Sequence, residues 1–141
     1  MKTVKQIVLS LALLITMNSY GQQIISAAGD TIVSVNSGGV ISNMNNQVYG
    51  KILSDGIVLD SQDQQVGSVV GNYIKDNSNV ILGNINVIDS NKLEVLDASN
   101  NLIGTFQYGV MFMDENNQLL MNITEPIEFK KFAAFYFFFN N

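Results

Sequence analysis

The chain has 141 residues, with seven Lys, no Arg, twelve acidic residues and a formal net charge of −5. It contains no Cys and no His, which excludes Ser-His-Asp and Cys-His nucleophiles and the usual zinc sites. Few cations in an acidic chain argue against a nucleic-acid partner, because neutralising phosphates needs clustered Lys and Arg.

Residues 1–21 have the pattern of a secretory signal peptide. Lys2 and Lys5 precede an apolar stretch from Ile7 to Met17, and Ser19-Tyr20-Gly21 places small residues at −3 and −1 before Gln22. The apolar stretch is short for a retained membrane anchor, which is the alternative. The sequence therefore predicts an exported protein, periplasmic or extracellular, whose residues 22–141 form one domain resting on its core without disulfides.

The domain is dominated by a unit that the chain repeats five times, in segments 39–54, 56–71, 72–88, 92–108 and 109–125. Each unit has Asp or Asn at an anchor position, numbered zero here, and a second Asn or Asp three residues later. The anchors are Asn43, Asp60, Asp76, Asp97 and Asp114, and the +3 residues are Asn46, Asp63, Asn79, Asn100 and Asn117. The link between the third and fourth units, around Asp89-Ser90-Asn91, is enlarged.

The columns of this repeat predict a β-hairpin in each unit. The anchor side chain suits the first position of a type I turn, and the +3 residue suits a left-handed closing position. Positions −2, +6 and +9 are apolar, and position +7 is Gly except at Met121. Side chains at +6 and +9, three residues apart, would point to opposite faces of a flat strand. We therefore expect a bulge at the intervening Gly, so that the side chains at −2, +6 and +9 all point into the core.

Small hairpins become stable by stacking on neighbours, so we expect the five to close into a ring or barrel-like array. An N-terminal strand is expected at Thr31 to Val35, bounded by turn residues, with a pairing partner that the sequence leaves open. The C-terminal aromatic segment, 126–141, holds six of the eight Phe, and whether it is strand or helix also stays open.

This arrangement resembles the five-fold β-flower proteins. The resemblance rests on the repeats from Ile41 to Ile123, of the form D-x-x-N-x-x-φ-G-x-φ, and on the tail from Phe132-Ala133-Ala134 to Phe139. It implies five hairpins around an axis and no activity, because the family's function is uncharacterised. Met121 and the enlarged link depart from the family's pattern.

Three functional hypotheses remain. We favour a non-catalytic structural or binding module, with no cofactor and with an unknown protein or glycan of the cell envelope as partner. A carboxylate-dependent, glycosidase-like hydrolase is one alternative. A calcium-binding module is the other, because hairpin tips pointing the same way would form an acidic rim; its candidate ligands are Asp60, Asp63, Asp76, Asp97 and Asp114. Turn chemistry already explains these acids, and no unit has the D-x-D-x-D-G spacing of a dedicated calcium loop.

The aromatic tail also has two interpretations. Phe132 to Phe139 could contact a membrane or a partner, but the run is shorter than a membrane-spanning element. We favour a core role, in which the tail fills the mouth of the ring.

Overall fold

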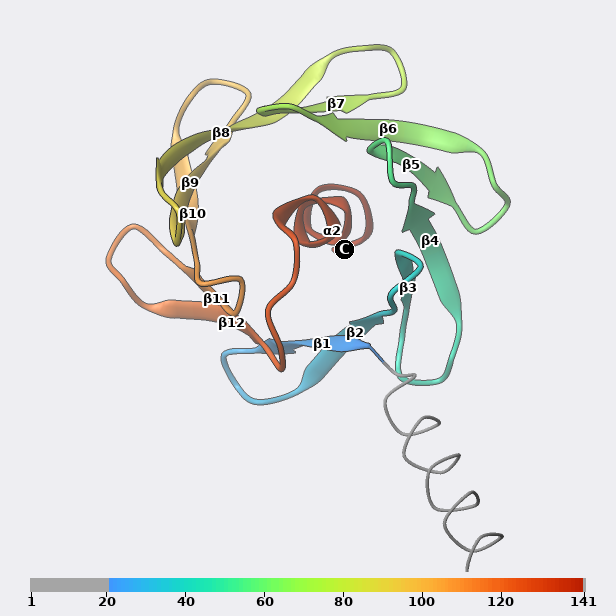
Figure 1. The fold of residues 1–141 in the computed structure, drawn as a ribbon, viewed down its shortest axis with the longest axis horizontal. Coiled ribbons are helices and arrows are strands. Elements are labelled where there is room, and N and C mark those ends of the chain that lie inside the picture. Colours follow the sequence, from blue (N-terminus) through green and yellow to red (C-terminus); the bar gives the residue numbers. More distant parts are fainter. Residues whose placement is uncertain (1–20, 141) are drawn as a thin grey trace, which may run out of the picture.

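The structure, a computed structural model, describes residues 21–140; the predicted signal peptide therefore lies almost entirely outside the described residues. Twelve antiparallel strands form a closed ring in which each strand pairs with its neighbours in sequence and β12 pairs with β1 (Figure 1). In chain order the strands are β1 (Gln22–Ser26), β2 (Thr31–Val35), β3 (Val40–Ser42), β4 (Val48–Ile52), β5 (Ile57–Asp60), β6 (Gln65–Val70), β7 (Tyr73–Asp76), β8 (Ile81–Asp89), β9 (Lys92–Asp97), β10 (Leu102–Gln107), β11 (Met111–Met113) and β12 (Leu119–Ile123). The predicted fold class, an all-β ring of repeated hairpins, is confirmed.

The tip loop of each repeated hairpin has the predicted turn chemistry. In the second unit the Asp63 N–H donates to the carbonyl of Asp60, and Asp63 has φ +61°. Every +3 residue is left-handed, at Asn46, Asp63, Asn79, Asn100 and Asn117. A type I turn followed by one left-handed residue matches the twist of the flanking strands, so a few local residues determine each hairpin.

The N-terminal segment closes the ring. The predicted strand at Thr31 to Val35 is β2, and it pairs with β3 on one side and with β1 on the other. We did not predict β1, whose Ile24 lies opposite Ile123 of β12. Because β1 and β2 form one further hairpin between the first and last repeats, the sheet has no open edge.

The bulge in each repeat lies one residue earlier than we expected. Val58 pairs with Gly67 and Leu59 pairs with Gln65, so Val66 at +6 is the extra residue. The prediction that column +6 turns fully inward is therefore wrong. Its residues are only partly buried, and Tyr49 is exposed.

The inward columns are −2, +7 and +9. The −2 residues are all buried, at Ile41, Val58, Ile74, Val95 and Phe112. The +7 glycine shares their face because residues directly opposite in an antiparallel pair point to the same side. This glycine leaves room in the ring for the C-terminal segment, which is helical.

The tail runs through the middle of the ring as α2 (Phe129–Ala134) followed by a π-helix, η2 (Phe135–Phe139) (Figure 1). Phe132, Ala133, Ala134 and Phe135 are fully buried. The Phe132 ring lies 5.0 Å from the ring centroids of both Phe106 and Phe112. Neither helix in the described part of the chain is long and apolar enough to cross a membrane.

Three consecutive Phe side chains of η2 contact the +7 glycines of three consecutive repeats. A Cβ added to Gly83 would lie 2.7 Å from the ring of Phe137, and Cβ atoms on Gly67 and Gly50 would overlap the rings of Phe138 and Phe139. An α-helix rotates successive side chains by about 100°. A π-helix has more residues per turn, so the rotation between successive side chains is smaller. This smaller rotation suits three successive Phe side chains that each reach the next hairpin of the ring.

Candidate functional site

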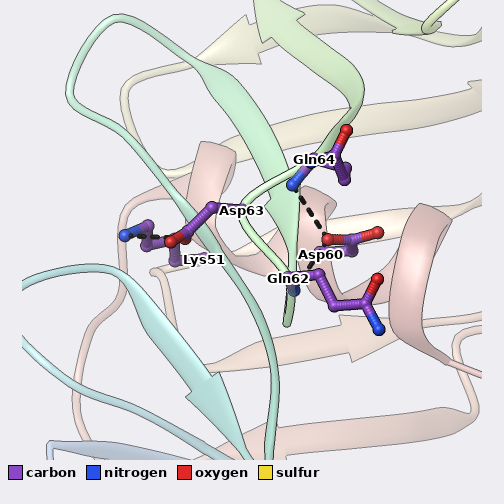
Figure 2. A network of polar contacts seen from close by, with 5 residues as sticks. All are labelled: Lys51, Asp60, Gln62, Asp63 and Gln64. Carbon is purple, nitrogen blue, oxygen red and sulfur yellow. Dashed lines mark hydrogen bonds and ion pairs between the residues drawn. The ribbon is translucent and has the colours of Figure 1, made fainter.

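The acidic residues predicted as possible metal ligands lie in the tip loops. In the second unit, Asp60 Oδ1 accepts hydrogen bonds from the backbone N–H groups of Gln62 at 2.8 Å and Gln64 at 2.9 Å (Figure 2). The equivalent two bonds form at Asn43, Asp76, Asp97 and Asp114. Asp63 pairs with Lys51 at 3.2 Å. One oxygen of each anchor is thus engaged in closing its own turn.

The structure does not bring these acids together. Asp60, Asp76, Asp97 and Asp114 sit on four different hairpins around the ring. Within residues 21–140, no group of three or more acidic side chains is close enough to hold a metal ion. At Asp97, the backbone N–H of Asn101 is the main cause that lowers the pKa of the carboxyl.

A different feature, the enlarged link between the third and fourth units, builds a concave site. β8 continues to Asp89 and pairs with β9 from Gly83 to Asp89, which lies opposite Lys92, with a bulge between Val87 and Asp89. The turn is closed by the Asn91 N–H, which donates to Asp89 Oδ1 at 2.7 Å. This longer hairpin overhangs the linker between β10 and β11, because the Tyr108 N–H donates to the Asn91 carbonyl at 2.7 Å.

A cavity of about 370 Å³, which we call the overhang pocket, lies under this turn. The residues that line it are Asp89, Ser90, Asn91, Lys92, Leu93, Phe106, Tyr108, Gly109, Pro126, Ile127 and Phe129. The wall opposite the turn is the segment leading into α2, held by a hydrogen bond from the Ile127 N–H to the Gly109 carbonyl at 3.0 Å. Phe106 and Phe129 meet edge to face, with ring centroids 5.6 Å apart.

Tyr108 is conformationally unusual within this pocket. Tyr108 has φ +56° and Gly109 has φ +70°, and the Val110 N–H donates to the Gln107 carbonyl. Left-handed backbone at both central positions defines a type I′ turn, where Asn, Asp or Gly is preferred at the first of them. An aromatic residue there is strained. The side chain is 60 % exposed, so burial in the core does not offset this strain.

Our sequence reasoning missed this pocket. Two signals were present: the enlarged spacing around Asp89-Ser90-Asn91, and a Tyr directly before a Gly in a linker. The first is an irregularity in an otherwise regular repeat. The second could not be recognised as strained until the turn type was known.

Chemically, the overhang pocket offers an apolar floor and a short polar rim. Phe106 and Ile127 are almost completely buried, whereas Asp89, Ser90 and Asn91 are exposed.

Among the described residues the only buried polar or charged one is Thr105, at 7 % exposure. Burial also raises the pKa of Tyr136, which lies in η2 inside the ring.

A family model described as "5-fold beta-flower protein" matches residues 21–140. Neither the curated proteins nor the solved structures gave a match.

Proposed function

The chain belongs to the 5-fold beta-flower protein family, and we propose that it is an exported, non-catalytic binding module that holds a protein or glycan partner of the cell envelope. The family membership makes it a small β-repeat module. Its export, its binding of a partner and its lack of catalytic activity are our proposals.

One observation carries the binding role. The overhang pocket combines an apolar floor with converging polar groups, the combination found in small-molecule sites. It stands on a closed sheet and against the core-packed tail, so its walls are held in place. A rigid, preformed concavity lowers the ordering cost of binding.

The distribution of carboxylates supports a non-catalytic role over a hydrolase. A glycosidase of the usual kind uses two carboxyl groups flanking the bond to be cleaved. Asp89 is the only acid that lines the overhang pocket, and its Oδ1 already accepts the Asn91 N–H. The anchor acids lie on separate hairpins, and one oxygen of each already accepts backbone N–H groups of its own turn.

The proposed export depends on the first 21 residues. Their charged start, apolar stretch and small residues before Gln22 fit a cleaved signal peptide. Expression of the full chain with its leader, followed by intact-mass measurement of the exported product, should give a mass starting at Gln22. A mature protein that retains Lys2 and the apolar stretch would contradict this part.

Binding and hydrolysis can be separated in one experiment. Mature protein is mixed with envelope polysaccharide fragments and with solubilised envelope proteins, and both retention of the ligand and release of new reducing ends are measured. We expect retention of a component with its mass unchanged. Release of reducing ends that Asp89→Asn abolishes would overturn the non-catalytic assignment, and failure to retain any component would overturn the binding role.

A further inference from the structure

We propose that the overhang pocket is a carbohydrate site that takes a neutral pyranose ring against Tyr108. This inference rests on the proposed binding function and specifies its ligand. It follows from the strained aromatic residue, the balance of charge at the rim and the size and rigidity of the cavity.

Tyr108 is the first argument. Its turn would be more stable with Asn, Asp or Gly, and its ring lies mostly outside the core, so neither local conformation nor packing explains an aromatic side chain here. An exposed phenol combines an apolar face with a polar tip. A pyranose ring has the matching surface, with a C–H face to lie against the aromatic ring and hydroxyl groups at its edge.

The rim of the pocket is the second argument. Ser90 and Asn91 bring short side chains that both donate and accept hydrogen bonds, as vicinal sugar hydroxyls require. The two charged lining residues, Asp89 and Lys92, have opposite signs. The pocket is therefore balanced in charge on a chain that is otherwise acidic, which favours a neutral ligand over a phosphate or an acidic sugar.

Size and rigidity are the third argument. A volume of about 370 Å³ is near the lower end of small-molecule sites, large enough for a sugar ring with part of its neighbour. The turn, the linker and the tail segment are joined by the hydrogen bonds of Tyr108 to Asn91 and of Ile127 to Gly109. Three segments distant in sequence are thus fixed around one cavity.

The test uses mature protein and short neutral oligosaccharides of hexose, pentose and N-acetylhexosamine, with uronic acid oligosaccharides and inorganic phosphate as charged comparisons. Binding is measured by titration calorimetry and by saturation-transfer NMR. Tyr108→Asn is the main variant, since Asn suits the left-handed turn and the protein should remain folded with an unchanged or higher melting temperature. We expect a neutral oligosaccharide to bind and Tyr108→Asn to weaken it by about tenfold or more.

Tyr73→Asn is the matched control. Tyr73 is an exposed Tyr on β7 that lines a different cavity with Asn72 and Asn100, so its replacement should leave affinity unchanged. Equal binding by Tyr108→Asn and the unaltered protein, or loss of binding in Tyr73→Asn alone, would overturn the inference. So would failure of every neutral oligosaccharide to bind while an envelope protein is retained, an outcome that leaves the proposed binding function standing. Retention of nothing from the envelope would instead refute the proposed function itself.

Discussion

Phe132→Ala tests whether the C-terminal tail is the core of the ring. Phe132 is 1 % exposed, and its ring centroid lies 5.0 Å from those of Phe106 and Phe112 and 5.8 Å from that of Tyr136. Truncating a fully buried Phe to Ala costs about 3–5 kcal/mol, because the transfer free energy is lost and a cavity remains. A domain of this size has a net stability of roughly 5–15 kcal/mol, so this one change should remove a large part of it.

The assay is a urea titration followed by circular dichroism. With a denaturant slope of about 1–2 kcal/mol per molar, the midpoint should fall by roughly 2 M or more while the slope stays the same. Tyr73→Ala is the surface control, since Tyr73 is 49 % exposed and the Lys75 ammonium lies 5.8 Å from its ring centroid. That variant should lose no more than about 1 kcal/mol. A Phe132→Ala protein within about 1 kcal/mol of the unaltered chain would refute a core role for the tail.

Four further predictions concern the repeat. Gly67→Ala should destabilise by about 1–3 kcal/mol because its Cβ would overlap the Lys75 carbonyl oxygen and the Phe138 ring. Gly38→Ala should be nearly neutral, because its Cβ would meet only the Asn36 side-chain oxygen, at 3.4 Å; equal midpoints of the two variants in urea would contradict this. Asn117 has φ +60°, so Asn117→Val should lower the free energy of unfolding by on the order of 1–2 kcal/mol, whereas Asn117→Gly should change it hardly at all. Indistinguishable thermal melts of the two variants would show that the turn does not need a left-handed residue. The Asp97 pKa is lowered in the folded state, so its stabilising contribution is present above the unfolded pKa and is lost as the pH falls below about 4. Asp97→Asn keeps the turn, because Asn43 makes the same two hydrogen bonds in the first unit, and it should flatten the plot of unfolding free energy against pH in this range. A plot that the substitution leaves unchanged would contradict a coupling between folding and the ionisation of Asp97. Millimolar calcium or chelator should leave the melting temperature unaltered, and a sharp rise with calcium would restore the acidic rim as a metal site.

Local chemistry explains why the sequence alone predicted the hairpins. The anchor at Asp60 and the left-handed Asp63 lie within one short loop, and the hydrogen bonds from Gln62 and Gln64 to Asp60 involve no residue outside that loop. Such turns depend on side chains two to four residues apart, so their pattern is visible in the sequence and repeats with it. The resemblance to the β-flower family rested on the same local pattern, and the family match confirmed it.

Contacts between distant residues decided the remaining features. The segment from Phe132 to Phe139 is apolar on every side, so no periodicity separates strand from helix, and its helical form follows from lying in an enclosed space where it must satisfy its own backbone hydrogen bonds. The bulge at Val66 leaves Gly67 facing inward, where the next strand and Phe138 meet it; that reason for a glycine exists only once the ring is closed. The overhang pocket likewise needs the turn at Asn91, the linker at Tyr108 and the tail to come together. The turn and the linker meet because β9 pairs with β10, where Lys92 lies opposite Gln107, and the tail joins them through the hydrogen bond from Ile127 to Gly109.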